Sequence, residues 1–186
     1  MSHKNLNIQK SSILLGSLPV EFDFNIMLDK GFTFIASGRS QKITPKIQYS
    51  VCNNEVVLQD LINSGSYSDA LLLVPRKIYV KYIFFEAVDC LPYFPEIAML
   101  NIDPDSLSNE SLALTLSCWM EHENIFVFGW DLENEIEKQR FLTIASLFPH
   151  CKIHFVRKPN PQKIGIFKDV PNITVIDYKE IKKLLS

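Results

Sequence analysis

Glycine is scarce in this chain, with 6 in 186 residues, about half of the ~7% that is usual in proteins. The sequence contains no G-x-G-x-x-G fingerprint, no P-loop and no G-x-S-x-G motif. It has no uncharged apolar run near the ~20 residues that a membrane-spanning helix needs. Its four cysteines are scattered and form no CxxC pair. A functional signal must therefore lie in the polar residues that follow predicted strands.

An excess of charge of either sign is also missing. Lysine and arginine number 19, aspartate and glutamate 21, and the formal net charge is −2. Binding along a nucleic-acid backbone normally needs a strong positive excess, so no nucleic-acid partner is expected. The 47% of hydrophobic and 22% of charged residues are typical of a globular protein. A length of 186 residues predicts one domain.

The first residues, MSHKNLN, are polar and have no apolar signal core. We therefore expect a flexible segment over residues 1–10, one domain over residues 11–186, and a cytoplasmic location. In a reducing compartment, scattered cysteines are expected to be small buried apolar residues. No membrane span is expected. A homodimer is compatible with the sequence, since closed dimers are the commonest oligomers.

Short apolar runs that alternate with helical patterns predict an α/β fold. The expected strands cover residues 12–15, 32–37, 47–51, 70–74, 96–102, 124–128, 152–156 and 173–176. The expected helices cover residues 22–28, 56–64, 77–87, 108–121, 132–148 and 178–185, and a loop is expected at 159–161. Ser108 or Asp105 is a candidate cap for the helix at 108–121, and Asp177 for the last helix. The pattern predicts a single Rossmann-like three-layer domain with a mostly parallel sheet.

In parallel sheets, ligands bind beyond the carboxyl ends of the strands, near the point where the strand order reverses. This rule selects residues 16–19, 37–40, 52–54, 75–77, 102–108 and 129–131. Gly16 would let the backbone approach a phosphate and Ser17 would add a hydroxyl donor, although the same residues also fit a plain turn. Arg39 could pair with a phosphate or be a solvated surface residue. Asp131 could accept hydrogen bonds from a sugar hydroxyl, cap the following helix, or do both.

Two acidic residues, Asp103 and Asp105, flank Pro104 before the predicted helix at 108–121. They could hold Mg²⁺ on a diphosphate, or they could form a solvated turn. Histidines and cysteines at positions 118, 122, 150, 151 and 154 do not have the three or four convergent ligands that zinc needs, so no metal site is predicted from them.

The spacing of several segments resembles a known family. These segments are ILLGSLP at 13–19, FIASGR at 34–39, YSVCN at 49–53, and the helix at 112–120 that leads into IFVFGWDL at 125–132. Their layout resembles the Rossmann-like bacterial sialyltransferases and the related motility-associated glycosyltransferase-like and hydroxymethylpterin pyrophosphokinase-like proteins. The most specific piece is the strand end with Gly129 and Asp131.

The resemblance implies a cleft that binds a nucleotide or a nucleotide sugar. By position, residues 16–19, with Gly16 and Ser17 as the candidate contacts, would lie against the phosphates, and Gly129 is a further candidate ligand-binding residue. Arg39 and Asn53 would line the donor pocket, and Ser108 and Asn109 would approach the nucleotide. Asp131 would close the site. If the protein is an enzyme, one of Asp103, Asp105 or Asp131 could serve as base or metal ligand, and Asp131 and Asp105 are the catalytic candidates. No histidine lies between His122 and His150, where the family's general base would fall, which implies reduced activity.

Two classes of function follow from these observations. The first is a glycosyltransferase-like protein that binds a nucleotide or nucleotide sugar. The second is a non-catalytic Rossmann-like module that binds a protein partner through exposed apolar residues such as Trp130, Tyr93 and Phe94. A polar cleft at the strand ends would favour the first, and a cleft filled by Trp130 and Leu18 would favour the second.

Overall fold

The protein is described here by a computed structural model that covers residues 6–43, 46–65, 67, 69–157, 167 and 170–185. Within these residues, eight strands form one sheet in which every neighbouring pair is parallel. The strands are β1 (Ser11–Leu15), β2 (Thr33–Ser37), β3 (Tyr49–Val51), β4 (Leu71–Val74), β5 (Val88–Cys90), β6 (Asn124–Phe128), β7 (Lys152–Arg157) and β8 (Ile173–Asp177). Their spatial order is β5-β4-β3-β2-β1-β6-β7-β8.

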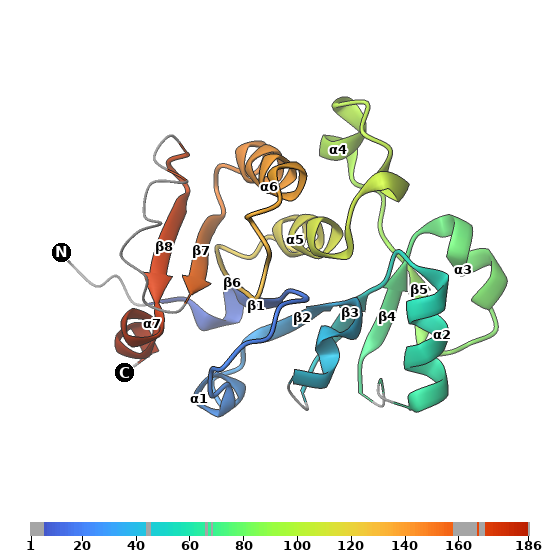
Figure 1. Cartoon of the computed structure of the whole chain (residues 1–186), viewed down its shortest axis with the longest axis horizontal. Coiled ribbons are helices and arrows are strands. Elements are labelled where there is room, and N and C mark those ends of the chain that lie inside the picture. The colour runs from blue at the N-terminus through green and yellow to red at the C-terminus, as the bar shows by residue number, and fades with distance from the viewer. Residues whose placement is uncertain are drawn as a thin grey trace.

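Helices cover both faces of this sheet (Figure 1). The helices are α1 (Asn25–Leu28), α2 (Glu55–Ser64), α3 (Arg76–Tyr82), α4 (Pro95–Met99), α5 (Asn109–Trp119), α6 (Glu135–Leu147) and α7 (Tyr178–Leu185), with 3-10 turns η1 (Ile8–Lys10), η2 (Gly38–Ile43) and η3 (Pro104–Ser106). Helices α4, α5 and α6 lie on one face, and α1, α2 and α7 lie on the other. The expected three-layer Rossmann-like α/β fold is confirmed.

The strand order reverses once, between β1 and β6. From β1 the chain moves outward through β2, β3, β4 and β5, and it then returns to β1 and moves the other way through β6, β7 and β8. Right-handed crossovers put α1 and α2, which connect strands of the first half, and α5 and α6, which lead into β6 and β7, on opposite faces. The switch point therefore lies at the carboxyl ends of β1 and β6, in the middle of the sheet.

Helix α5 lies against the centre of the sheet and contacts β1, β2, β3 and α6. Every residue from 111 to 118 is buried, including three hydroxyl side chains. The Thr115 hydroxyl donates to the Ser111 carbonyl at 2.9 Å, and the Ser117 hydroxyl meets the Ser12 hydroxyl of β1 at 2.5 Å. Because these hydroxyls have partners, α5 can be enclosed on all sides without leaving polar groups unsatisfied.

Several predicted elements differ from the structure. The strand expected at 96–102 is wrong: these residues contain α4, because Pro95 occupies the first helical position, where a proline costs no hydrogen bond. The helix expected at 77–87 ends at Tyr82, and the three-residue strand β5 begins at Val88. The helix expected at 22–28 begins only at Asn25. The loop expected at 159–161 lies outside the described residues.

The amino-terminal residues are described from residue 6 onward. Residues 8–10 form η1, and Leu6 and Ile8 pack against the core. Residues 1–5 lie outside the described part, and the flexibility expected over residues 1–10 stays a prediction.

Two predicted helix caps are confirmed. The Ser108 hydroxyl accepts from the Ser111 backbone N–H at 3.1 Å and begins α5. The Asp177 carboxylate accepts from the backbone N–H groups of Lys179 and Glu180 at 2.7 and 2.9 Å and begins α7. Each cap satisfies donors that the first helical turn leaves free.

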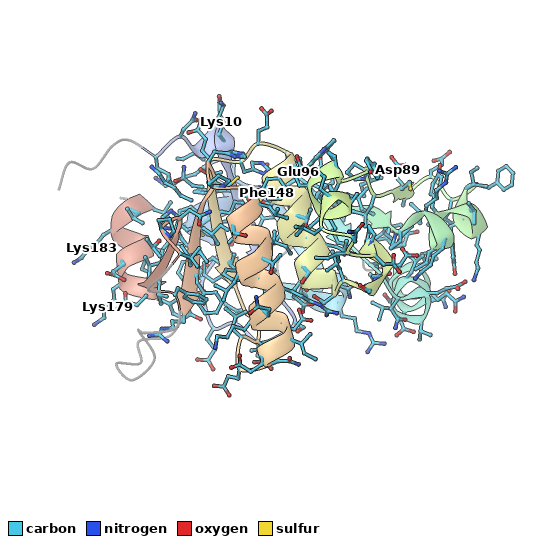
Figure 2. All side chains as sticks on the ribbon, turned by 90° about the horizontal axis from the view of Figure 1, so that it is seen from above. Lys10, Asp89, Glu96, Phe148, Lys179 and Lys183 are labelled. Atoms are coloured by element: carbon cyan, nitrogen blue, oxygen red, sulfur yellow. The ribbon has the colours of Figure 1, made fainter. Side chains whose placement is uncertain are left out.

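The short edge strand β5 has two outward backbone N–H groups, and both have partners within the chain. The Val88 N–H donates to the Phe85 carbonyl at 2.9 Å, and the Cys90 N–H donates to the Asp89 carboxylate at 2.7 Å. Figure 2 shows Asp89 toward the end of the molecule that carries β5, with Lys179 and Lys183 of α7 at the opposite end. The N–H groups of Val88 and Cys90 are therefore not available to a further strand.

No helix in the described part of the chain is both long enough and apolar enough to cross a membrane.

His154 on β7 is held as a neutral ring. Its imidazole stacks on Phe126 with centroids 4.7 Å apart, and Nδ1 lies 2.7 Å from the Thr174 hydroxyl. Burial, with a smaller contribution from Lys152, lowers the pKa of His154 to about 4. The charged ring is therefore disfavoured in the folded state.

Stability is expected to fall as the pH is lowered through the range from about 6.5 to about 4. The pKa of His154 is about 4 when folded, and that of an unfolded histidine is about 6.5, so in this range protons bind to the unfolded chain first. The free energy of unfolding should drop by up to about 3 kcal/mol from this residue. The measurement is urea unfolding at neutral and at acidic pH for the wild type and His154→Gln. An equal pH dependence in both proteins would contradict the assignment.

Candidate functional site

The switch point between β1 and β6 is closed by backbone. The Gly16 N–H donates to the Phe128 carbonyl and the Leu18 N–H to the Gly129 carbonyl, both at 2.7 Å. A Cβ on Gly16 would lie 2.5 Å from the Gly129 carbonyl oxygen, and a Cβ on Gly129 would lie 2.5 Å from the Leu18 oxygen. The N–H groups of Gly16 and Leu18, which the resemblance would turn toward phosphates, are thus bonded across the sheet. Gly129 has a φ of +67°, which favours glycine.

The Glu110 carboxylate, bonded to Ser17, places a negative charge beside the contact of Gly16 with Gly129. The Ser17 backbone N–H donates to the Glu110 carboxylate at 3.1 Å, and Glu110 lies in the first turn of α5. A carboxylate near a helix N-terminus interacts favourably with the helix dipole. In this arrangement the Ser17 N–H already has an anionic partner, so a phosphate would have to displace it.

Asn53 and Asn109 are brought together at the end of β3. The Asn109 side-chain oxygen accepts from the Asn53 backbone N–H at 2.6 Å. The Asn53 amide donates to the carbonyls of Asp105 and Leu107 at 3.0 and 2.7 Å, and so ties η3 to the sheet. The Asn53 side-chain oxygen is buried and has no hydrogen-bond partner in the described part of the chain. Asn53 therefore shapes the carboxyl edge and keeps one acceptor unused.

Ser108 is joined to α6 through Glu137 and Arg140. The Ser108 hydroxyl donates to Glu137 at 2.6 Å, and Arg140 donates to the other Glu137 oxygen at 2.6 Å and to the Ser106 carbonyl at 2.9 Å. These contacts fix the loop between η3 and α5 from the side of α6. Ser108 thus acts as a helix cap and as part of this network.

Arg39 and Asp131 are each engaged in local contacts. The Arg39 guanidinium forms an ion pair with Asp60 of α2. The Asp131 carboxylate accepts from the Glu133 backbone N–H at 2.9 Å, which makes a turn. The cap of α6 is Asn134, so the expectation that Asp131 caps this helix is wrong: three residues separate Asp131 from the first helical residue. Asp131 and Asp105 do not hydrogen-bond to each other in the described residues.

Trp130 and Phe94 are buried, with exposed fractions of 3% and 2%, whereas exposure was expected. The Trp130 ring packs edge-on against Phe141 of α6 at 4.9 Å. Tyr93 is 73% exposed, as expected. The apolar surface predicted from these three residues is therefore carried by Tyr93 alone.

Two hollows lie at the carboxyl ends of β3, β4 and β5, to one side of the switch point. The first, which we call the polar hollow, has a volume of about 430 Å³ and is lined by Asn53, Asn54, Glu55, Val56, Lys77, Ile78 and Lys81. The second, which we call the aromatic groove, has a volume of about 700 Å³. Its lining includes Arg76, Tyr79, Tyr93, Phe94, Asp103 and Asp105.

Ion pairs dominate the charge around these hollows. The Lys77 ammonium lies 3.2 Å from the Asp105 carboxylate, and the Lys81 ammonium lies 2.6 Å from the Glu55 carboxylate. The hydrogen bond between Lys81 and Glu55 lowers the pKa of Glu55 and raises that of Lys81. Arg76 forms no ion pair among the described residues. It is therefore the cation of this edge that remains open to a ligand.

Cys52 follows β3 but is buried and poorly suited to attack a substrate. Burial raises the pKa of its thiol to about 12, against small opposing effects of the Asn54 backbone and the Arg39 charge. The thiolate is the nucleophilic form of cysteine, and it is scarce at neutral pH when the pKa is this high.

Sequence reasoning selected residues 75–77 as a strand end but assigned no role to Arg76 or Lys77. It missed Lys81 and Tyr79, which face the hollows from later turns of α3. The helical spacing of Lys77 and Lys81, four residues apart on one face, was a signal for Lys81, and no signal in the sequence pointed to Tyr79.

Comparison with models of protein families, with curated proteins and with solved structures finds no match to this chain. Among the described residues, no group of three or more histidine, cysteine, aspartate or glutamate side chains could hold a metal ion.

Replacing Gly16 with alanine is expected to lower the free energy of unfolding by about 2–3 kcal/mol, because the added Cβ would overlap rigid backbone. The matched control is Gly31→Ala, where a Cβ meets open space and only the positive φ opposes it. The control should cost about 1–2 kcal/mol. Urea unfolding monitored by circular dichroism measures both. An equal or smaller loss for Gly16→Ala would contradict the close contact with Gly129.

Replacing Asn53 with alanine is expected to destabilise the fold by about 1–3 kcal/mol, because the carbonyls of Asp105 and Leu107 lose their donor. The control is Asn63→Ala, at an exposed position of α2, which should change stability by less than about 0.5 kcal/mol. Thermal unfolding of both variants provides the comparison. Equal stability of the two variants would show that η3 does not depend on Asn53.

Proposed function

We propose that the protein binds a nucleotide or a nucleotide sugar, in a glycosyltransferase-like manner and with reduced activity, at the carboxyl ends of β3, β4 and β5. The observation that carries this proposal is the pairing of the polar hollow with the aromatic groove. The Lys77 ammonium of one hollow touches the Asp105 carboxylate of the other, so that the two hollows adjoin. A nucleotide likewise joins a flat aromatic base to charged phosphates.

The aromatic groove has the size and the walls that a base needs. Its volume of about 700 Å³ falls in the range of roughly 300–1,000 Å³ that is typical of small-molecule sites. Tyr79 and Tyr93 supply aromatic rings, and base stacking on such rings contributes about 1–3 kcal/mol per base. The remaining walls are largely apolar, which excludes water from the stacked base.

Cations and amides in the two hollows suit phosphates and a sugar. Arg76 lines the aromatic groove and presents a planar guanidinium that can bond a phosphate through two N–H groups. Lys77 and Lys81 line the polar hollow together with the amides of Asn53 and Asn54. The proposal thus retains Asn53 at the site, with Asn109 bonded to its backbone N–H, but moves the phosphates away from Gly16 and Ser17, whose backbone donors are occupied.

Reduced activity is proposed for chemical reasons. The Cys52 thiol is a poor nucleophile, and the candidate bases Asp105 and Asp131 are engaged by Lys77 and by the Glu133 N–H. The resemblance to Rossmann-like sialyltransferases supports a nucleotide ligand. The sequence has no counterpart of that family's histidine, which supports reduced activity. The proposal keeps the cytoplasm as the expected location.

A thermal-shift screen with cytidine and uridine nucleotides and their sugar conjugates, with and without Mg²⁺, tests this function. A ligand at about 100 times its Kd should stabilise the fold by ~2.7 kcal/mol and raise the Tm by about 5–10 °C. Arg76→Met should lose most of the shift, because it removes the open cation. The control Lys179→Met, on α7 at the opposite end (Figure 2), should keep it. An unchanged Tm throughout the panel would reject the proposal.

A partner-binding module is the second candidate, and one observation favours it. Apolar side chains beside the aromatic groove are strongly exposed: Phe84 is 98% and Tyr93 is 73% exposed, and Val80 and Ile83 are also exposed. Clusters of exposed apolar residues mark interaction surfaces. Light scattering during size-exclusion chromatography would show whether a second copy of the chain covers them.

A further inference from the structure

One ion pair stands between the two hollows. Lys77 comes from the first turn of α3 and Asp105 from η3, and their charged atoms lie 3.2 Å apart. The side chains are 53% and 35% exposed, so water reaches both. Lys77 faces the polar hollow and Asp105 lines the aromatic groove. A ligand that used both hollows would have to pass this contact.

The main chain of η3 is fixed while the Asp105 carboxylate is not. The Asp105 carbonyl accepts from Asn53 at 3.0 Å, the Asp105 N–H donates to the Asp103 carboxylate at 3.0 Å, and the Ser106 carbonyl accepts from Arg140 at 2.9 Å. The carboxylate itself has Lys77 as its only ion-pair partner among the described residues. It can therefore rotate away while the loop stays in place.

We propose that the Asp105 carboxylate occupies the phosphate position on Lys77 and is displaced when a nucleotide binds. This inference rests on the proposed function and names the ligand class: a nucleoside phosphate with its base in the aromatic groove. The phosphate replaces Asp105 on Lys77, at the border of the groove that Arg76 lines. Binding breaks the ion pair between Lys77 and Asp105 and forms one between Lys77 and the phosphate. Without a ligand, the Asp105 carboxylate therefore blocks the phosphate position through a contact that contributes little energy.

The energetics favour this exchange. An exposed ion pair contributes little in water, since solvent screens both charges. A phosphate carries a charge of about −1.5 to −2 at neutral pH and three acceptor oxygens. It is therefore a stronger partner for the Lys77 ammonium than the Asp105 carboxylate is. A nucleoside without phosphate gains nothing from the exchange.

The test is titration calorimetry with cytidine 5′-monophosphate, uridine 5′-monophosphate and the nucleoside cytidine. Asp105→Asn should tighten monophosphate binding about 3–10-fold, because it frees Lys77 and removes a repelling charge. Lys77→Met should weaken it about tenfold. Cytidine should bind all three proteins equally. The gain from Asp105→Asn should shrink at high salt, which screens exposed charges.

The matched control is Asp60→Asn, which removes the carboxylate of another exposed ion pair, that with Arg39, and changes the net charge equally. It should leave affinity within about twofold, because a single exposed pair away from the hollows contributes little. Circular dichroism establishes that each variant is folded, and Asp105→Ser repeats the test if the asparagine variant is not. Monophosphate binding that Asp105→Asn weakens or leaves unchanged would overturn this inference alone. Absence of binding to both wild type and Asp105→Asn would overturn the proposed function with it.

Discussion

The contact between Gly16 and Gly129 is the constraint on which the arrangement of the carboxyl edge depends. It joins the ends of β1 and β6 so closely that neither residue could carry a side chain. The backbone hydrogen bonds that accompany it extend the pairing of the two central strands past their ends. A Rossmann-like sheet usually leaves this crevice open for a ligand. Here the backbones at Gly16 and Gly129 are in direct contact at this crevice, and two hollows lie two to four strands away.

The position of the hollows, away from the switch point, explains why the polar residues have two different roles. Those nearest the switch point hold the architecture: Asn53 ties η3 to β3, and Ser108 links α5 to α6. The groups that a ligand can reach come from α3 and η3, at the side of the sheet. One end of the site is thus built by rigid backbone contacts and the other by half-exposed charges that can change partners.

The sequence was sufficient for the fold because the signals were local and strong. Buried runs such as residues 124–128 and the caps at Ser108 and Asp177 specify strands and helices without reference to the rest of the chain. The strand prediction for residues 96–102 was wrong because an apolar run of this length fits either a strand or a short helix. Pro95, at the first helical position, favours the helix. The three-residue strand β5 carries too little pattern to be recognised.

The site was less predictable, since it depends on which strand ends meet. Gly16 and Gly129 each fit a phosphate loop when taken alone, and only their mutual contact closes the space. Trp130 follows a strand and could have been exposed, but α6 folds over it through Phe141. Conversely, Arg76 and Tyr79 have no motif, and they matter because β5 and η3 bring a second wall opposite α3.

The capped edge strand β5 has a consequence for how the protein behaves at high concentration. A sheet of parallel strands with a bare edge can recruit the same edge of another molecule and grow into aggregates. The Asp89 carboxylate and the Phe85 carbonyl occupy the N–H groups through which such growth would begin. The N–H groups of this edge are therefore taken by partners within the same molecule, which makes the addition of a further strand beside β5 less favourable.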